Sequence, residues 1–498
     1  VAKPGFINLW LDSSMWQIYL KHSLELDDLI DCNIGNGRTV NVEYVSANPT
    51  GPLHIGHCRG AVFGDVLSNL LQKTGHQVTK EYYINDAGSQ IKNLTNSVFI
   101  RYQELIGKKF SEYPDDFYPG DYLVPVAQHF ASTYNSKLLE MNDEERFLLI
   151  KPFTINFMMN LIKEDLAAIS IHQDIFISEQ DLVSNGKIDE AIKALKKSNL
   201  IYEGVLEPPK GKKPDDWEPR PQMLFKSTKY GDEVDRPLQK SNKEWTYFAN
   251  DIAYHFDKYQ RGSNHLVDIL GADHGGYVKR MTAAVAALSD NKASFTAKLC
   301  QMVKLTRNGK QIKMSKRSGE FITLREVIDE VGSDSIRFMM LYRKNEAPLE
   351  FDFTKVTEQS KDNPVFYVQY AHARISSVIS KLNENNFSHM PSNFENIDFT
   401  LIDNKHELDL VKKIADWNKT IESATNLHEP HRIAYYLYEL SSVFHSLWSQ
   451  GKIDPNLKFI IPNNETLTFA RIGLLTLTQR TIKSGLDLLG VSSPHEMK

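Results

Sequence analysis

The chain has 498 residues, of which 41% are hydrophobic and 24% are charged, so its composition excludes a wholly disordered protein and its length predicts about three domains. Lys and Arg total 58 and Asp and Glu total 63, and the net charge of −5 excludes a strongly basic nucleic-acid binder but allows local basic patches. The cysteines Cys32, Cys58 and Cys300 lie far apart and form no CxxC pair, so we expect neither a disulfide framework nor a protein zinc site.

The N-terminal region gives no targeting or membrane signal. No apolar run approaches the roughly 18–20 residues that a membrane helix needs, so we expect no membrane association. The chain starts at Val1 without a charged-then-apolar leader, which favours a cytoplasmic protein with a trimmed N-terminus. Residues 1–11 suggest a turn and a short apolar strand, and an acidic stretch without periodicity leads to the turn signal at 35–37.

The next segment predicts the start of a parallel α/β sheet. Residues 40–45 alternate like a strand, a loop of small residues follows at 46–52, and an apolar period predicts a helix over 54–73. Gly75 comes just after that helix, where a C′ glycine is expected, and 78–84 is a second strand. The order strand, loop, helix, strand predicts a Rossmann-like domain with its site at the strand C-termini.

The middle of the chain is expected to be a mostly helical insertion. Its periodicity predicts helices over 152–169, with an N-terminal proline, and over 188–200. Residues 203–243 are rich in Pro, Lys and Asp, which is typical of a solvated hairpin; the alternative is contact with an acidic partner.

Strand-like runs resume after the insertion, and helices dominate the end of the chain. The strands are expected at 266–270 and 300–306, followed by a basic loop at 307–317 and a helix from about Leu324. From Pro364 onward nearly every segment has a helical period. This part is expected to form a separate all-α module, with helices over 366–382, 406–424 and 433–448.

A histidine pair lies where the first strand loop becomes a helix. His54 and His57 are three residues apart and therefore share one face of the first helical turn. The unpaired N–H groups and positive dipole end of such a turn favour an anion, and Gly56 lets a flat ring or a phosphate approach the backbone. The pattern favours a phosphate site; the alternative is two histidines at a helix start without a ligand.

A lysine motif, Lys313-Met314-Ser315-Lys316, lies in the later basic loop. Ammonium groups at i and i+3 suit a triphosphate whose charge rises as a bond to its α-phosphate breaks. A lysine-rich loop alone is typical of a solvated turn. Its coincidence with a phosphate-ready helix start about 260 residues earlier indicates nucleotide chemistry.

The two motifs together resemble the HIGH-type and KMSK-type motifs of class I aminoacyl-tRNA synthetases. Residues 42–57, 83–90, 271–274 and 367–374 closely resemble arginyl-tRNA synthetases, and 485–491 resembles the C-terminus of that family. The resemblance covers essentially the whole chain. Many members of the family have a degenerate lysine loop, whereas the loop of this chain is complete.

The resemblance implies three regions. Residues 1–35 are expected to be the C-terminal remnant of an N-terminal additional domain that grips the tRNA elbow, so tight tRNA binding is in question. Residues 36–360 are expected to be the catalytic domain, with the insertion at about 90–245 and the KMSK loop at 307–320. Residues 361–498 are expected to be an α-helical anticodon-binding domain.

The implied activity is that of an arginine–tRNA ligase. Such an enzyme activates L-arginine with ATP and Mg²⁺ to arginyl-adenylate and transfers it to the 3′-terminal adenosine of tRNA-Arg, first to the 2′-hydroxyl. In this family, activation typically needs bound tRNA. The implied partners are therefore L-arginine and tRNA-Arg, and the implied oligomeric state is a monomer.

The resemblance also implies which residues hold ATP. His54 and His57 would contact the α-phosphate region, and Lys313 and Lys316 would contact the leaving pyrophosphate with Mg²⁺. The other expected nucleotide contacts are Pro52, Leu53, Ile55, Gly56, Gly271, Asp273, His274, Met302, Val303, Met314 and Ser315.

Arginine selection needs carboxylates and planar acceptors, because a guanidinium donates five N–H bonds in a fixed fork. The positions that match the arginine pocket of the family are Glu43, Ser46, Asn48, Tyr247 and Asp251. Tyr247 and Asp251 are four residues apart in an apparently helical segment and so share a face. Two alternatives stay open: Asp251 as a surface carboxylate, and Glu43 as a salt-bridge partner at the strand end.

Aromatic side chains in the C-terminal module are candidates for tRNA contact. Tyr367 and Tyr370 lie on one face of a predicted helix, beside His372 and Arg374. Aromatic rings and arginine can stack on splayed anticodon bases, so Tyr367, Tyr370 and Arg374 are candidate anticodon contacts. The alternative is that one tyrosine belongs to the helical core.

Other nucleotide-binding classes fit the sequence less well. Synthetases for Cys and Met often use Cys/His zinc clusters, and those for Val, Leu and Ile are much longer. A small nucleotidyltransferase would lack the helical C-terminal module. A non-catalytic, synthetase-like RNA-binding protein is the remaining alternative, and the intact histidines, loop lysines and pocket acids count against it.

Overall fold

The computed structural model describes residues 9–207, 220–312, 322–384 and 394–497. Its centre is a five-stranded parallel sheet with the strand order β3-β2-β1-β7-β8. The strands are β1 (Thr39–Glu43), β2 (Gln77–Ile84), β3 (Ile175–Ser178), β7 (His265–Gly271) and β8 (Ser294–Cys300). Because the order changes direction at β1, the crevice beyond the C-terminal ends of β1 and β7 is the place where such sheets bind ligands.

The helix α2 (Ile55–Lys73) crosses from β1 to β2 and packs tightly on the sheet. A Cβ on Gly64 would lie 2.3 Å from the ring of Tyr44, so only glycine allows this close approach. The helix is capped by His54 and ends at Thr74, and Gly75 follows with φ +87°. The predicted helix and its C′ glycine are both confirmed.

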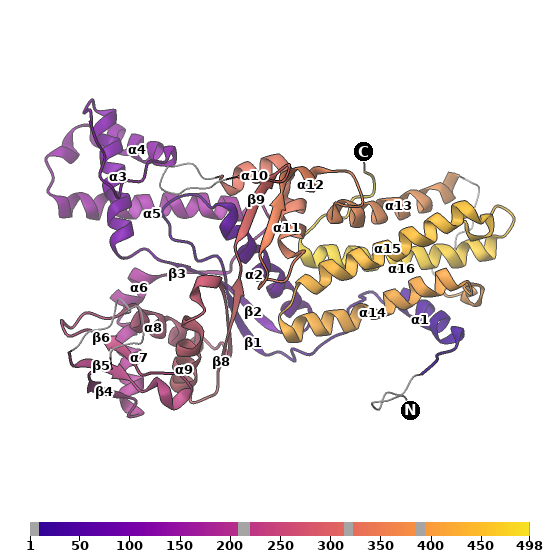
Figure 1. Ribbon diagram of the computed structural model, residues 1–498, viewed down its shortest axis with the longest axis horizontal. Helices are drawn as coiled ribbons and strands as arrows, with labels where there is room; N and C mark the ends of the chain where they lie inside the picture. Colours follow the sequence, from indigo (N-terminus) through magenta and orange to yellow (C-terminus); the bar gives the residue numbers. More distant parts are fainter. Residues whose placement is uncertain (1–8, 208–219, 313–321, 385–393, 498) are drawn as a thin grey trace.

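Two lobes are inserted into the sheet, on the side opposite the C-terminal helices (Figure 1). The first lobe joins β2 to β3 and has its own core; it consists of α3 (Ser89–Leu105), η1 (Asp121–Leu123), α4 (Val124–Tyr134), η2 (Lys137–Leu139) and α5 (Asp143–Ala167). The second lies mostly between β3 and β7 and consists of α6 (Glu179–Ser184), α7 (Lys187–Lys197), the antiparallel strands β4 (Ile201–Gly204), β5 (Gln222–Phe225) and β6 (Arg236–Gln239), η3 (Ser227–Tyr230), α8 (Tyr247–Gln260), η4 (Ala272–His274) and α9 (Tyr277–Ser289).

Two expectations for this region are corrected. The predicted insertion at 90–245 is interrupted, because β3 lies within it and pairs with β2 as part of the central sheet. Pro152 is inside α5 rather than at its start, because the helix already begins at Asp143 with a capping box between Asn142 and Glu145. Part of 203–243 is an antiparallel sheet, and 208–219 lies outside the described residues.

A small second sheet follows the central one. The predicted strand at 300–306 is in fact two strands, since β8 ends at Cys300 and β9 (Val303–Arg307) begins after a break. The chain changes sheets there because β9 pairs in parallel with β11 (Leu349–Asp352) instead of continuing beside β7. The other elements of this region are β10 (Lys310–Gln311), α10 (Leu324–Val331), α11 (Ser333–Leu341) and α12 (Phe353–Thr357).

The C-terminal part is a helical bundle, as predicted (Figure 1). Its elements are α13 (Pro364–Glu384), η5 (Phe399–Leu401), α14 (Lys405–Leu427), α15 (His431–Ile453), η6 (Pro455–Leu457) and α16 (Glu465–Leu489). The acidic N-terminal stretch is a helix as well, α1 (Ser13–Glu25), and it packs on α14 and α16. Gln17 Nε2 joins it to the bundle by donating to the carbonyls of Thr400 and Ile402 at 3.1 and 3.0 Å.

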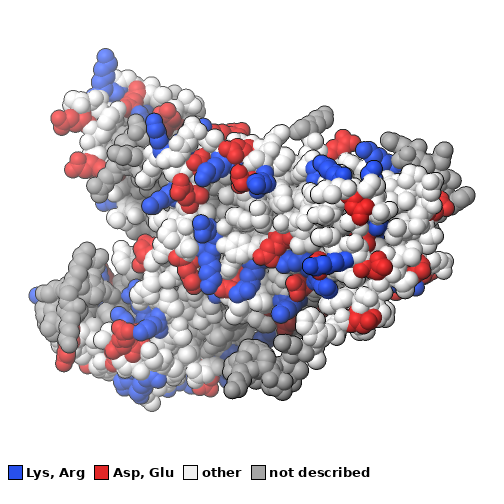
Figure 2. Space-filling model, turned by 45° about the vertical axis from the view of Figure 1, so that its right-hand side comes forward, with Lys and Arg blue, Asp and Glu red and all other residues white. Residues whose placement is uncertain are grey.

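The surface agrees with the near-neutral composition. On the face shown in Figure 2, basic and acidic side chains are interspersed and neither sign dominates. Among the described residues, no helix combines the length and the apolar content needed to cross a bilayer.

Candidate active site

The loop that leaves β1 has an unusual backbone. Val45 has φ +72° and Ser46 has φ +39°, in the left-handed region that a β-branched residue adopts only at a cost. Hydrogen bonds hold this turn: Ser46 Oγ donates to Glu43 Oε1 at 2.8 Å and accepts the N–H of Tyr83 at 3.1 Å. Backbone strain held in place by specific side-chain bonds is typical of a functional turn.

The two predicted histidines stack on each other at the start of α2. Their ring centroids are 3.8 Å apart, at an interplanar angle of 25°. His57 Nδ1 accepts the backbone N–H of His54 at 3.3 Å, and His54 Nδ1 accepts that of Gly56 at 3.1 Å. A neutral ring whose Nδ1 accepts carries its proton on Nε2, so Nε2 is the donor nitrogen of each ring. A Cβ on Gly56 would lie 2.8 Å from the His54 ring, which explains the glycine.

The lysine motif Lys313, Met314, Ser315 and Lys316 lies outside the described residues. The chain that follows it is described, and it contacts the histidine turn. Thr323 forms an antiparallel bridge with His54, and the N–H of Leu324 donates to the carbonyl of Leu53 at 2.8 Å. The segment that begins at Ile322 is therefore joined to the histidine turn through backbone pairing.

A cavity of about 800 Å³ opens in front of this turn, a size typical of small-molecule sites. It lies between the β1 loop, the start of α2, the first lobe and η4. The predicted site residues that line it are Ser46, Asn48, Pro52, His54, His57, Asp273 and His274. The structure thus brings the histidine pair together with polar residues from two strand ends.

Some expected nucleotide contacts are corrected. Leu53 and Ile55 are 1% and 0% exposed, so their side chains belong to the core rather than to a nucleotide site. The Leu53 backbone is also occupied, because its N–H donates to Asp165 Oδ2 at 3.2 Å and its carbonyl accepts from Leu324. The side chain of Val303 is buried in β9, and the contact between its backbone and adenine stays a prediction.

The other expected nucleotide residues are at strand ends. Gly271 ends β7, and a Cβ there would lie 2.5 Å from Asp273 Oδ1. Met302 is 74% exposed between β8 and β9, but its carbonyl already accepts the N–H of Leu349 at 3.3 Å. The Met302 carbonyl has one further lone pair, so a backbone contact with adenine stays a prediction.

The expected arginine residues fall into two groups. Glu43 ends β1 and is buried, with Lys258 Nζ 2.5 Å from its Oε2. Glu43 therefore forms the salt bridge at the strand end that was the alternative to arginine binding. Asn48 Nδ2 donates to Gln90 Oε1 at 2.8 Å, and Tyr247 is 81% exposed at the start of α8.

Asp251 lies one turn further along α8 and, unlike Glu43, has a carboxylate without an observed partner among the described residues. It is partly buried, and no hydrogen bond or ion pair of its carboxylate occurs within the described parts of the chain. Burial raises the pKa of Asp251 to about 7, with Glu43 and Glu179 adding to the shift and His255 and Arg280 opposing it. A carboxylate held in this way would gain much from a guanidinium.

Comparison with known proteins agrees with this geometry. Residues 20–379 match the family model "tRNA synthetases class I (R), catalytic domain", and residues 368–497 match "DALR anticodon binding domain". An arginine–tRNA ligase from Rhizobium etli is 53% identical over 100% of this chain and 86% of its own length. The chain belongs to the arginine–tRNA ligase family.

Solved structures support the family assignment. A putative arginyl-tRNA synthetase from Campylobacter jejuni superimposes with a TM-score of 0.82 at 30% identity, over 98% of this chain and 100% of that chain. Arginyl-tRNA synthetase from Thermus thermophilus shares the fold, with a TM-score of 0.70 at 19% identity over 97% of this chain and 86% of that one. The family resemblance and the fold class inferred from the sequence are thereby confirmed.

The candidate anticodon residues of this family member are linked to one another. Arg374 donates to the Tyr370 hydroxyl at 2.7 Å and to His445 Nδ1 at 3.1 Å, and its guanidinium lies 4.2 Å from the Tyr370 ring centroid. Tyr367 packs on His445, with 4.5 Å between the centroids. All three candidate side chains are partly buried, so each packs against its neighbours and also has an exposed part.

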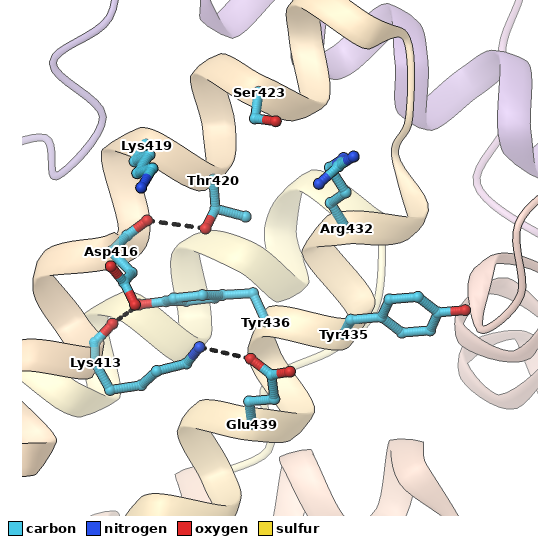
Figure 3. A pocket seen from close by; sticks show the side chains of 9 residues that line it. All are labelled: Lys413, Asp416, Lys419, Thr420, Ser423, Arg432, Tyr435, Tyr436 and Glu439. Atoms are coloured by element: carbon cyan, nitrogen blue, oxygen red, sulfur yellow. Dashed lines mark hydrogen bonds and ion pairs between the residues drawn. The ribbon is translucent and has the colours of Figure 1, made fainter. Parts of the chain in front are cut away.

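A separate hollow of about 350 Å³ lies between α14 and α15 (Figure 3). Two of its three cations are paired: Lys413 Nζ lies 2.6 Å from Glu439 Oε2, and Arg432 Nε donates to Glu429 at 2.6 Å. The Tyr436 hydroxyl donates to the Lys413 carbonyl at 3.0 Å. Internal pairing of these groups gives this hollow little to offer a charged ligand.

Sequence reasoning missed two parts of the site. The first is the wall contributed by the first lobe, where Tyr122 lines the cavity and its hydroxyl donates to the Thr50 carbonyl at 2.9 Å. Its only sequence signal is the run of acidic and aromatic residues at 113–122. The second is a buried charge cluster on α8 and β7 that contains His255, Lys258 and Asp268.

Proposed function

We propose that this chain is an arginine–tRNA ligase that activates L-arginine with ATP and transfers it to the terminal adenosine of tRNA-Arg. The observation that carries the proposal is the His54–His57 pair at the start of α2, after β1, together with Asp251 in the second turn of α8, in a class I synthetase fold. One group suits a guanidinium and the other suits a phosphate.

The chemistry needs no protein nucleophile. The arginine carboxylate attacks the α-phosphorus of ATP, so catalysis consists of positioning and charge stabilisation. His54 and His57 donate from Nε2 to the α-phosphate, in the tautomer that their Nδ1 contacts select. Lys313 and Lys316 neutralise the pyrophosphate, which leaves with the Mg²⁺ that accompanies ATP as substrate.

We assign substrate selection to Asp251 and Tyr247 on α8 and to Ser46 and Asn48 in the loop after β1. A site with a buried acceptor strongly rejects analogues that leave this acceptor unpaired, so uncharged analogues of arginine should bind poorly. The exposed Tyr247 side chain can close over the substrate. Tyr367, Tyr370 and Arg374 are the proposed anticodon contacts, and the cytoplasmic location and monomeric state stay predictions.

The test is ATP–pyrophosphate exchange with each standard amino acid, with and without total tRNA. We expect exchange with arginine alone, and only when tRNA is added. Exchange with a different amino acid would overturn the pocket assignment. The absence of exchange in every condition would favour a non-catalytic relative.

A further inference from the structure

Lys258 is a fully buried cation beneath the proposed arginine pocket. It lies on α8 two turns after Asp251, and its side chain is 0% exposed. Its Nζ donates to Glu43 Oε2 at 2.5 Å and to Asp268 Oδ1 at 3.0 Å, which joins the ends of β1 and β7. The ammonium also lies 4.4 Å from the centroid of the Tyr254 ring.

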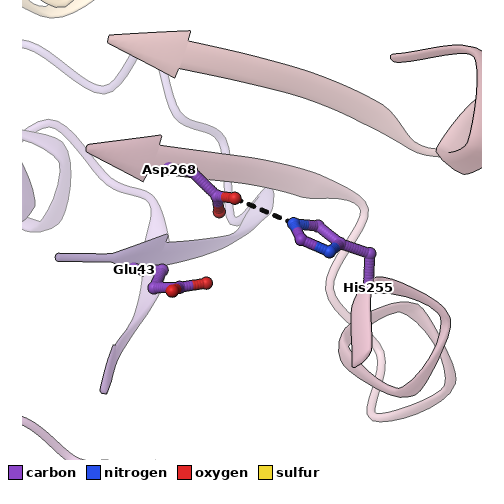
Figure 4. Close-up of side chains that lie close together, drawn as sticks. All are labelled: Glu43, His255 and Asp268. Atoms are coloured by element: carbon purple, nitrogen blue, oxygen red, sulfur yellow. Dashed lines mark hydrogen bonds and ion pairs between the residues drawn. The ribbon is translucent and has the colours of Figure 1, made fainter. Parts of the chain in front are cut away.

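The surrounding cluster is fixed by further contacts. His255 Nε2 contacts Asp268 Oδ2 at 2.8 Å (Figure 4). His255 Nδ1 contacts the Asp251 carbonyl at 2.8 Å. Ligand atoms of Glu43, His255 and Asp268 lie within 4.8 Å of one another, a spacing that would suit a metal ion. The Lys258 ammonium already supplies the positive charge at this place, so the cluster is better described as an internal ion network.

Glu43 connects Lys258 to the loop that follows β1. One of its oxygens accepts from Lys258 and the other accepts from Ser46 Oγ at 2.8 Å. Ser46 is in the left-handed turn that leads to Asn48 and the histidine pair. The chain of contacts therefore runs from Lys258 through Glu43 to the loop that lines the cavity.

We propose that Lys258 is a positioning residue for arginine selection. Its ammonium fixes the direction of Glu43, and through Glu43 the Ser46 turn, while the Asp251 carboxylate, which has no hydrogen bond or ion pair within the described residues, receives the substrate. The inference rests on the proposed function and adds a residue to it. Lys258 touches no substrate in this scheme and acts only through Glu43.

The balance of charges supports this assignment. Burial opposes ionisation of Asp268, but Lys258 and His255 outweigh it and lower the pKa of that carboxyl to about 2. Without Lys258, the carboxylates of Glu43 and Asp268 would repel each other and attract cations of any shape, including a lysine or ornithine substrate. Lys258 offsets one of these two negative charges, so that discrimination depends more on the Asp251 carboxylate, which suits a guanidinium.

The decisive experiment compares Lys258→Met with the double variant Lys258→Met/Asp268→Asn. The single change leaves buried carboxylates unpaired and lowers stability, whereas the double change also removes one negative charge and keeps the shape of Asp268. We expect both to raise the arginine KM at least about tenfold, since Glu43 loses its donor, with the ATP KM and the saturated kcat nearly unchanged.

A matched control is Lys80→Met. Lys80 is also a mostly buried lysine on the central sheet, with its Nζ 3.0 Å from Asp65, but it is not part of this network. We expect it to lower the melting temperature and to leave the arginine KM unchanged. A merely structural role for Lys258 would show the same pattern, with fewer active molecules and an unaltered KM.

The outcomes separate the two proposals. A folded double variant with the wild-type arginine KM would overturn the role of Lys258 and leave the proposed function intact. Failure of the unaltered chain in arginine-dependent exchange would overturn the proposed function, and the role of Lys258 with it. If the single variant does not fold, the double variant alone decides.

Discussion

The strand-end pocket and the helical bundle treat their polar groups in opposite ways. In the pocket, Val45 and Ser46 hold a left-handed turn, and the Asp251 carboxylate has no hydrogen bond or ion pair within the described parts of the chain. In the bundle, the buried Arg471 is held by several partners: its Nε donates to Glu407 Oε1 at 2.6 Å, and its NH1 donates to two backbone carbonyls at 2.7 Å.

The difference separates charges that stabilise the fold from charges that favour ligand binding. A paired buried charge contributes to the folded state alone, whereas an unpaired one costs stability until a ligand arrives. The unpaired carboxylate in the pocket therefore lowers the stability of the fold but favours ligand binding, whereas the paired charges in the bundle stabilise the fold. Substitutions should accordingly change activity in the pocket and mainly stability or tRNA affinity in the bundle.

The largest effect is expected at the histidine pair. His57→Ala removes a donor to the α-phosphate and should lower the rate of tRNA-dependent pyrophosphate exchange on the order of 10²-fold or more. The measurement is kcat at saturating arginine, with a thermal melt to verify folding. His76→Ala, outside the cavity after the end of α2, is the matched control; an equal loss in both variants would contradict a specific role for His57.

The next effect is a pH dependence of arginine binding. Burial raises the pKa of Asp251 to about 7, and a cationic guanidinium needs the ionised form of this carboxyl. Arginine affinity should therefore be constant above this pH and fall about tenfold for each pH unit below it, because binding must then release a proton. Isothermal titration between pH 5 and 8 measures this; a flat profile over the range would exclude Asp251 as the titrating partner.

A smaller effect is expected in the bundle. Tyr370→Ala removes a ring that is proposed to stack on an anticodon base, and should raise the tRNA KM about fivefold while the arginine KM stays constant. Tyr370→Phe, which keeps the ring and loses the hydroxyl contact with Arg374, is the control. An unchanged tRNA KM in Tyr370→Ala, together with a lower melting temperature, would assign this tyrosine to packing alone.

The smallest effect concerns stability. The pKa of Asp251 is raised on folding, so the folded state loses stability relative to the unfolded state as the pH rises from about 4 to about 7. Asp251→Asn should therefore melt a few degrees higher than the unaltered chain at pH 8 and about equally at pH 4. Melting curves at the two pH values measure the difference, and a lower melting temperature of the variant at pH 8 would contradict the unpaired state of the carboxylate.

Local signals in the sequence were enough to predict the elements that carry the motifs. The strand β1, the helix α2 with Gly75 after its end, and the helical bundle follow from periodicity and capping chemistry. The predicted strand boundaries that were wrong depend on pairing with strands that are distant in sequence. β3 is a short strand whose place in the sheet comes from pairing with β2, and the break between β8 and β9 comes from pairing with β11.

The contacts within the site could not be predicted for the same reason. The residue types of Glu43 and Asp251 indicated guanidinium binding, but the sequence could not show that Lys258 already pairs with Glu43, because 215 positions separate the two along the chain. The same applies to Leu53 and Ile55, which flank the histidine turn in sequence but point into the core. A motif identifies the chemistry, whereas three-dimensional packing decides which of its atoms face the ligand.

The most direct test of this account measures the binding of arginine and of citrulline, its uncharged analogue, to the unaltered chain and to Asp251→Asn by isothermal titration at pH 8. The account predicts that the unaltered chain binds arginine at least about a hundredfold more tightly than citrulline, and that the variant loses most of this preference. If Asp251→Asn kept the full preference for arginine, the claim that this unpaired carboxylate selects the substrate would be wrong.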